Sequence, residues 1–545
     1  MAVPPRLIVS QSDVVSLPNM MNRRFYSDSR TEVETAEGKV HGCFLNDHYY
    51  FRGIPYATAE RFRSPKPMEH WDGVREAVTY GPVAPTLSKP SVSRMYALTQ
   101  QPLFGYRFWP EDEQCQYVNV WTRSPDPSRK RPVMVWVHGG GFGTGSSVEQ
   151  MSYDGANLCR DGDLVVVSFN HRLNILGYMD FSEFGDEYWN SGNAGMEDIV
   201  ELLRWVRRNI EKFGGDPENV TLFGQSGGGG KIRTLMQIPD ADGLYQRVIF
   251  QSGLMNLPGE VDDAANNRRV CRAMVEKLGL TKETFHKIAE VPYDRLCQVY
   301  NESVKVLADE GINLHGIVQP VRNAYYVGNP NEVGLTEYAK KVPVMGGTCQ
   351  CETVLYAQNI YTYDTSDEKK DELLTDLFGD KKDEMIKLFR SVYPDGDLLD
   401  LYNLDFIVRK GVYEFFDRKA ECEAPLYCYM ITYHLNYFGG IPAYHGFCLP
   451  LVFGNTEYVD ACNEPDCVAL SQKMHQAWIN FATCGDPNGG DVPRWEPYRK
   501  GECGTMIFDR QCGMRYNFDR ELVWKFQENT DLEFNFMRVK KNRKS

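Results

Sequence analysis

The 545-residue chain carries 60 Lys and Arg against 74 Asp and Glu, which gives a formal net charge of −14. This acidity argues against a basic face for nucleic acid and against attraction to an anionic membrane surface. No apolar run approaches the roughly 20 residues that a membrane-spanning helix needs. The length would allow three or four domains of roughly 150 residues, although α/β enzymes often form longer single units.

The 15 cysteines are the unusual feature of the composition. Residues 1–30 form a polar arm that lacks the apolar stretch of roughly 7–15 residues and the small-residue cleavage site of a secretory leader. We therefore expect a cytoplasmic protein in a reducing compartment, where cysteines stay thiols. A leader removed beforehand would give the same pattern.

Two cysteine pairs close in sequence raise the question of a metal site. Cys349 and Cys351 form one pair, and Cys462 and Cys467 form the other. Neither pair is accompanied by a second pair or by histidines at the spacing of a zinc site. We expect loop and core thiols, and neither a metal nor an organic cofactor.

Strand patterns begin after the polar arm. Short alternating segments over 31–51 predict β-hairpins. Further along the chain, near-continuous apolar runs predict strands that are buried on both faces, at 133–137, 164–167, 220–223 and 248–250. Apolar residues at three- and four-residue steps predict a helix over 196–213. Strands and helices in this order predict a parallel, doubly wound α/β sheet.

Two later stretches have helical and charged patterns, at about 255–340 and about 359–420. Strand patterns return at 341–346 and at 426–432. No internal repeat and no low-complexity linker separates these parts. We therefore expect one folded unit over 31–545 that carries the two stretches as helical insertions laid over the sheet.

A glycine-rich segment at 224–228, Gly-Gln-Ser-Gly-Gly, follows a predicted strand and precedes a helical pattern. The pattern Gly-x-Ser-x-Gly places a serine, here Ser226, on a sharp strand-to-helix turn. The start of the following helix offers N–H donors and a favourable dipole to developing negative charge. A glycine turn with a bystander serine is the alternative. A phosphate-binding loop does not fit, because Gln225 and Ile232 stand where it needs Gly and Ser or Thr.

A second glycine-rich segment, His-Gly-Gly-Gly-Phe at 138–142, directly follows the strand predicted over 133–137. Glycines let backbone N–H groups approach a reacting carbonyl, and one such donor to an oxyanion is worth about 10²–10³ in rate. This loop ahead of Gly-x-Ser-x-Gly is the arrangement of lipases and esterases. We interpret His138 itself as a residue that shapes the loop.

A serine nucleophile needs a base and a carboxylate that orients the base, in the chain order Ser, Asp or Glu, His. His445 lies in a loop after the strand predicted over 426–432, where a base can be presented at the end of a strand. His434 lies on or beside that strand, and we interpret it as structural. Glu352 follows the strand predicted at 341–346, but spacing alone does not single it out among many carboxylates.

The chain resembles the type-B carboxylesterases, the α/β-hydrolases that include the cholinesterases, from about residue 33 to the C-terminus. The resemblance rests on Phe-Arg-Gly-Ile-Pro-Tyr-Ala at 51–57, the segment 138–142, and matching segments at 117–121, 170–173, 209–217, 223–226 and 478–487. It implies an α/β-hydrolase fold, with a central mostly parallel sheet flanked by helices. It also implies a single catalytic domain over 31–545, with helical insertions over the C-terminal edge of the sheet.

The resemblance also implies roles for individual residues. Ser226 would be the nucleophile, His445 the general base and then acid, and Glu352 the orienting carboxylate. The oxyanion hole would be formed by the N–H groups of three residues, Gly140, Gly141 and Gly227.

The activity implied is that of a bacterial-type intracellular carboxylesterase, a serine hydrolase that cleaves small-molecule esters through an acyl-enzyme. We expect a monomer or homodimer without a nucleic-acid or membrane partner. An amidase, a carbamate hydrolase or a lipase on the same scaffold is an alternative, and a non-catalytic neuroligin-like binding protein is another.

The chain departs from the family pattern in three places. Gln225 and Gly227 replace the usual Glu and Ala beside the serine, so a cationic choline ester is not implied. Secreted members pair a cysteine at the position of Cys115 with one near 81–85, a stretch without cysteine here, which again predicts free thiols. Cys448, which follows Phe447, stands at a frequently acidic position, so we expect a more apolar pocket beside the base.

Substrate specificity is expected to depend on the two helical insertions and on the loop from about 84 to 114. Four aromatic residues in that loop could line a gorge or could equally anchor the packed loop: Phe104, Tyr106, Phe108 and Trp109.

Overall fold

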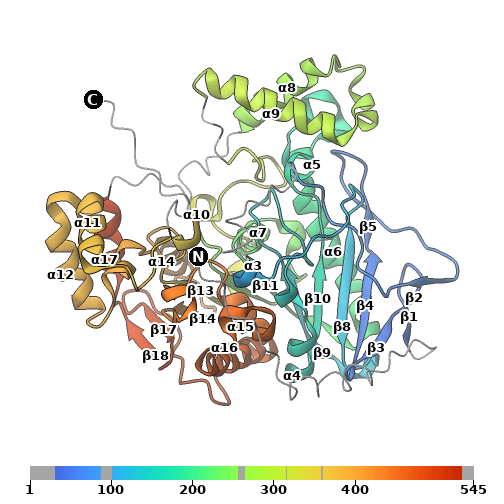
Figure 1. Ribbon diagram of the computed structural model, residues 1–545. Helices are drawn as coiled ribbons and strands as arrows, with labels where there is room; N and C mark the ends of the chain where they lie inside the picture. Colours follow the sequence, from blue (N-terminus) through green and yellow to red (C-terminus); the bar gives the residue numbers. More distant parts are fainter. Residues whose placement is uncertain are drawn as a thin grey trace, which may run out of the picture.

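The computed structural model describes residues 31–87, 101–255, 264–312, 314, 316–356 and 360–530. The polar arm expected over 1–30 lies outside these residues. Figure 1 shows one large sheet through the middle of the molecule with helices on both sides.

The sheet has 11 strands, and its centre is parallel. The six pairings between β17 and β10 are parallel, whereas β18, β8, β4 and β3 pair antiparallel at the two edges. The expectation of a mostly parallel sheet is therefore confirmed. In spatial order the strands are β18 (Gly513–Tyr516), β17 (Gly504–Phe508), β14 (Leu426–Ile431), β13 (Val344–Cys349), β12 (Arg247–Gln251), β11 (Gly215–Gln225), β9 (Arg131–Val137), β10 (Val165–Phe169), β8 (Tyr117–Thr122), β4 (His48–Pro55) and β3 (Cys43–Leu45).

The predicted strands are all present. The four apolar runs form β9 to β12, and the early alternating segments form the hairpins β3–β4 and β1 (Glu32–Glu34) with β2 (Lys39–His41). The predicted helix is α6 (Ala194–Asn209), which ends before 213 because the chain tightens into a 3₁₀ turn, Ile210–Phe213. Gly214 then leaves the turn with φ 82°.

Continuous apolar strands occur here because both faces of the sheet are covered. Side chains alternate between faces along a strand, so Val135 packs with α6 in one core, whereas Trp136 packs with α16 (Pro465–Cys484) in a second core. Helices α4 (Ala156–Gly162) and α15 (Cys448–Phe453) join the face of α16, and α14 (Val408–Lys419) and α17 (Arg520–Glu528) join the face of α6. The sheet is thus held between two helical layers.

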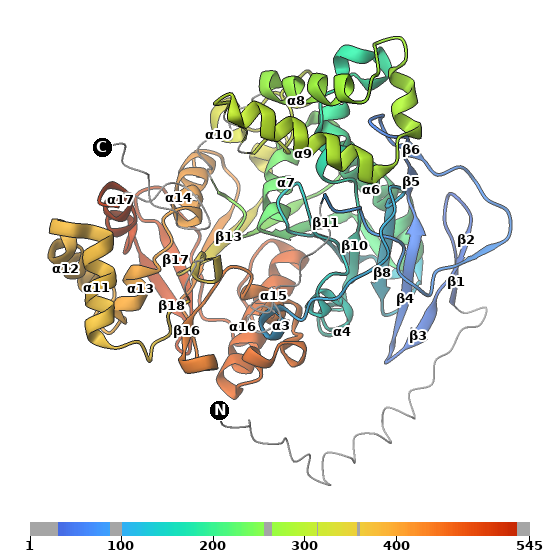
Figure 2. The same ribbon diagram turned by 45° about the horizontal axis from the view of Figure 1, so that its top comes forward.

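Helices of the first insertion form a small core of their own. Helices α8 (Ala264–Lys277) and α9 (Tyr293–Asp309) lie side by side and pack on α5 (Asn174–Tyr178), as Figures 1 and 2 show. Met274 and Val299 meet Ile175 in this core.

Helices of the second insertion lie near the edge of the sheet formed by β17 and β18. Helices α11 (Asp367–Phe378) and α12 (Lys382–Val392) join α13 (Leu398–Tyr402) and α14 beside α17. Phe378 and Phe406 both contact the ring of Phe526 on α17. Among the described helices, none combines the length and the apolarity that crossing a membrane would require.

Candidate active site

Ser226 lies at the tip of a sharp turn between β11 and α7 (Gly227–Leu235). Its backbone has φ 57° and ψ −125°, a strained conformation for a residue with a side chain. Its N–H donates a hydrogen bond of 2.8 Å to the carbonyl of Gln251 on the neighbouring strand β12. The flanking glycines are required, because a Cβ on Gly228 would lie 2.0 Å from the carbonyl oxygen of Val137. The motif predicted from the sequence therefore forms the expected turn.

A glycine loop, residues 138–145, leaves the end of β9 beside this turn. Gly140 and Gly141 both adopt the left-handed conformation, with φ 83° and 61°. The loop lies directly against the start of α7, since a Cβ on Gly227 would be 2.3 Å from the nitrogen of Gly141. The N–H groups of these three glycines form no hydrogen bond with another described residue. The structure thus brings together all three residues predicted to form an oxyanion hole.

His445 and Glu352 form a direct hydrogen bond, with 2.6 Å between Nδ1 and Oε2. Their side chains are 5 % and 0 % exposed. The carboxylate also accepts a hydrogen bond of 2.6 Å from the N–H of Cys349 and one from the hydroxyl of Thr348. Because a carboxylate only accepts, Nδ1 of His445 donates this hydrogen bond, and in the neutral imidazole Nε2 is then the acceptor.

The charge state of Glu352 follows from two opposing effects. Burial raises the pKa of its carboxyl, but the hydrogen bond and charge of His445, together with the hydroxyl of Thr348, bring the pKa below its ordinary value. Glu352 is therefore an anion that fixes the orientation of the imidazole.

Gln225 meets the other nitrogen of the same imidazole. The amide nitrogen of Gln225 lies 3.1 Å from Nε2 of His445. With the proton on Nδ1, Nε2 accepts and the amide donates. Gln225 therefore supplies a neutral hydrogen-bond donor beside Ser226 and adds no negative charge there.

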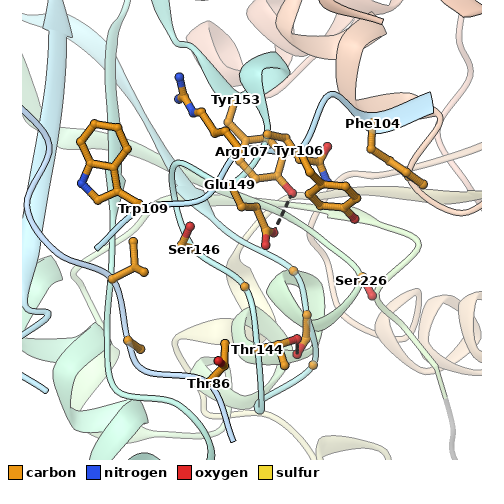
Figure 3. Close-up of a pocket in the computed structure, with 18 of the residues that line it drawn as sticks. Thr86, Phe104, Tyr106, Arg107, Trp109, Thr144, Ser146, Glu149, Tyr153 and Ser226 are labelled. Carbon is orange, nitrogen blue, oxygen red and sulfur yellow. Dashed lines mark hydrogen bonds between the residues drawn. The ribbon is translucent and has the colours of Figure 1, made fainter. Parts of the chain in front are cut away.

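A cavity of about 670 Å³ opens over these residues. Ser226 and His445 line it together with Gly140 and Gly141, so the predicted nucleophile, base and two of the three glycines share one space. All four aromatic residues of the predicted gorge also line it: Phe104, Tyr106, Phe108 and Trp109. Figure 3 shows the side chains of Phe104, Tyr106 and Trp109 higher in the view than Ser226.

The cavity walls correct the expectation that both helical insertions shape the substrate site. Apart from Ser226, its neighbour and the 445–449 segment, the lining comes from 83–87, 104–111 and 139–153. Within the described part of the chain, no residue of 255–340 or 359–420 lines the cavity. Helices α8 and α9 of the first insertion pack in a small core with α5, and the helices of the second insertion pack into the main core of the sheet. The loop within 84–114 contributes as predicted.

Polar residues that the sequence analysis did not select also line the cavity. Glu149 accepts a hydrogen bond of 3.5 Å from the hydroxyl of Tyr153, which Figure 3 marks. Burial raises the pKa of Glu149 to about 7. The positive charge of Lys231 acts in the opposite direction, because it favours the carboxylate. Arg107 lines the same cavity. These are single residues in irregular segments, so the sequence carried no motif that could have identified them.

Other expectations concern residues away from the cavity. Nε2 of His434 lies 3.1 Å from Oδ2 of Asp400, and His434 is absent from the cavity lining, in line with a structural role. All 15 cysteines are free thiols, including Cys115. No group of three or more His, Cys, Asp or Glu side chains in the described residues is arranged to hold a metal ion.

Comparison with known proteins places this geometry in a family. The model of the carboxylesterase family matches residues 29–521. The para-nitrobenzyl esterase of Bacillus subtilis is 31% identical over 493 residues, which cover 88% of this chain and 95% of that protein. The phenmedipham hydrolase of Pseudarthrobacter oxydans is 30% identical over 510 residues, with 88% and 95% covered.

Solved structures give the same result. The structure of an esterase from the anaerobe Clostridium hathewayi, described as able to hydrolyse aliphatic aromatic polyesters, superposes with a TM-score of 0.86. It is 39% identical, with 93% of this chain and all of that chain covered. A para-nitrobenzyl esterase structure superposes with a TM-score of 0.71 at 29% identity, covering 91% of this chain and 100% of that chain. The protein therefore belongs to the carboxylesterase family and is a carboxylic ester hydrolase of the α/β-hydrolase fold.

Proposed function

We propose that the protein cleaves small-molecule carboxylic esters through an acyl-enzyme formed on Ser226. The observation that carries this proposal is the 2.6 Å hydrogen bond between His445 and the buried Glu352, at a cavity that Ser226 and His445 line together. A nucleophile, an oriented base and a buried carboxylate are the parts that acyl transfer by a serine needs.

This arrangement supports a reaction in two stages, acylation of Ser226 and hydrolysis of the acyl-enzyme. The hydroxyl oxygen of Ser226 attacks the acyl carbonyl while Nε2 of His445 takes its proton. The oxyanion is stabilised by the N–H groups of Gly140, Gly141 and Gly227, which have no other partner among the described residues. The imidazolium, stabilised by Glu352, returns the proton to the leaving alcohol. Water then repeats the two steps and releases the acid.

The lining of the cavity supports esters with an aromatic or long apolar group. Phe104 and Trp109 offer apolar faces at the wall, and Phe108 is 67 % exposed at the rim. The names of two relatives point the same way, since one is a para-nitrobenzyl esterase and another hydrolyses aliphatic aromatic polyesters. The same residues could also attack an amide or a carbamate, so these activities and that of a lipase are kept as alternatives.

Compartment and organisation are also proposals. The 15 free thiols support a reducing, cytoplasmic location. One continuous sheet supports a single catalytic unit over the described residues from 31 onward. A monomeric or homodimeric state stays a prediction.

A panel of p-nitrophenyl esters of graded acyl length, with matched p-nitroanilides, tests the proposed activity. We expect turnover of the esters, weak or no turnover of the anilides, and loss of nearly all turnover in Ser226→Ala with an unchanged circular dichroism spectrum. Faster turnover of the anilides would favour an amidase. A neuroligin-like binding protein would turn over neither series.

A further inference from the structure

Lys231 is a buried lysine directly behind the glycine loop. It lies on α7, the helix that begins at Gly227, and its exposed fraction is 0 %. Its Nζ donates hydrogen bonds to the carbonyl oxygens of His138, at 3.0 Å, and Gly139, at 3.4 Å. The nucleophile and this ammonium group are thus carried by the same turn and helix.

A buried lysine without a close carboxylate is unusual, because burial disfavours the charged form. No described carboxylate forms an ion pair with Lys231, and Glu149 acts on it only at longer range. A methionine or leucine would fill such a site without this penalty. The two carbonyl groups that hold the ammonium are therefore the feature to explain.

The carbonyl of Gly139 and the N–H of Gly140 belong to one peptide group. A positive charge at the carbonyl oxygen withdraws electron density from the amide and makes its N–H a stronger donor. Nδ1 of His138 donates a second hydrogen bond, of 2.9 Å, to the same oxygen. Both donors therefore polarise this peptide group at its carbonyl oxygen. The N–H at its other end, that of Gly140, has no partner among the described residues, and Gly140 lines the cavity.

We propose that Lys231 is a positioning residue that strengthens the oxyanion hole, by polarising the Gly139–Gly140 peptide and fixing the glycine loop against α7. The proposal rests on the proposed function, because it assumes that these N–H groups bind the oxyanion. Lys231 itself does not touch the substrate.

The groups around Lys231 determine how this effect depends on pH. Burial, with the charge of Lys231 as a smaller cause, lowers the pKa values of His138 and His171 well below their ordinary range, so both imidazoles are neutral near pH 7. Arg172 acts on His171 in the same direction. Burial lowers the pKa of Lys231 to about 7, and the charge of Glu149 opposes this shift. The ammonium is therefore present at lower pH and is lost as pH rises through this value.

The test compares wild type with Lys231→Met, which keeps the length of the side chain and removes its charge. Lys419→Met is the matched control, because Lys419 is 1 % exposed and also donates to a backbone carbonyl, that of Lys340, away from the cavity. Ester turnover is measured from pH 6 to pH 9. Binding is measured for a trifluoromethyl ketone and for the matching methyl ketone.

The two ketones separate the oxyanion from ordinary binding. The hydroxyl oxygen of Ser226 adds to the trifluoromethyl ketone, so a C–O bond forms, the C=O π bond becomes an oxyanion, and the proton moves to His445. The methyl ketone binds mainly as the intact carbonyl. A group that acts on the oxyanion changes the affinity of the first ketone and leaves that of the second unchanged.

We expect Lys231→Met to lower kcat roughly tenfold at pH 6.5, a fraction of the 10²–10³ that a whole oxyanion-hole donor is worth. The trifluoromethyl ketone should lose affinity by the same factor, with KM and the methyl ketone within twofold of wild type. The difference between the two enzymes should shrink above about pH 8, where wild type has also lost the charge. Lys419→Met should leave all of these values unchanged.

Several results would overturn the proposal. These are a kcat of Lys231→Met within twofold of wild type, an equal loss of affinity for both ketones, or a pH-independent defect. If Lys231→Met does not fold, Lys231→Gln takes its place, and failure of both to fold would show that Lys231 serves stability alone. Ser226→Ala is measured alongside, because turnover in that variant would overturn the proposed function itself rather than the role of Lys231.

Discussion

Gly227 approaches the glycine loop more closely than any side chain would allow. A Cβ at this position would lie 2.3 Å from the nitrogen of Gly141 and 2.4 Å from its Cα and its oxygen. Non-bonded carbon atoms are in favourable contact at about 3.5–4.0 Å, so Gly227→Ala must displace the loop by roughly 1 Å. The contacting atoms are backbone, which cannot turn away as a flexible side chain can.

The displacement acts on the predicted oxyanion hole. Misplacement of about 1 Å can cost 10²-fold in rate, and loss of one oxyanion-hole donor costs about 10²–10³ in kcat, or about 2.7–4 kcal/mol. We therefore expect Gly227→Ala to lower kcat about 10²-fold with a much smaller change in KM. The N–H of residue 227 itself stays at the start of α7, which is why the loss is not larger.

Gly230→Ala is the matched control on the same helix. A Cβ there would meet only Cζ of Phe142, at 4.0 Å, so kcat should stay unchanged. The free energy of unfolding should rise by about 0.5–1 kcal/mol, because Ala is preferred to Gly inside a helix. Initial rates on p-nitrophenyl butyrate and thermal unfolding measure both effects. A kcat of Gly227→Ala within threefold of wild type would refute the close approach as a requirement for catalysis.

Three further substitutions probe charge around the site and in the core. Gln225→Glu places a carboxylate beside Nε2 of His445, where the amide nitrogen now lies at 3.1 Å. The negative charge should move the acid limb of the kcat/KM–pH profile to higher pH by about one unit. An unchanged acid limb would contradict this prediction. Glu352→Gln should lower kcat about 10⁴-fold in steady-state assays, because the imidazole loses its orienting anion, and a loss below tenfold would speak against that role. Asp198→Asn breaks a buried ion pair of 2.7 Å with Arg172. It should lower the free energy of unfolding, measured by urea titration, by about 3–5 kcal/mol. A change below about 1 kcal/mol would contradict this prediction.

The central strands and the serine turn could be predicted because their signals are local. A near-continuous apolar run predicts a strand that is covered on both faces, and β9 to β12 follow that pattern. The turn at Ser226 needs small neighbours within two residues, which the motif states directly. The apolar pattern does not mark the end of α6, since the 3₁₀ turn Ile210–Phe213 continues that pattern.

Glu352 could not be selected from spacing, because its partner His445 is 93 positions away. The two residues meet because β13 and β14 are parallel neighbours, so the segments that follow them leave the sheet at the same edge. Only the family resemblance pointed to this carboxylate, and the structure now shows its contact with the imidazole.

Lys231 and the helical insertions show what sequence patterns leave out. Lys231 stands in a glycine-rich helix, and its contact with His138 spans 93 positions, so no motif connects them. The helical patterns of the first insertion do not reveal that α8 and α9 bury their apolar faces in a core with α5. Apolar helical patterns predict that a helix is covered, and they do not indicate what covers it.

Ser226 as the nucleophile is tested most directly by peptide mapping of the enzyme after reaction with a fluorophosphonate. We predict one phosphonyl group per chain, attached to the peptide that contains Ser226, with loss of ester turnover in proportion to labelling. The variant Ser226→Ala should take up no label. A phosphonyl group on another residue, or turnover that survives complete labelling of Ser226, would contradict the proposed mechanism.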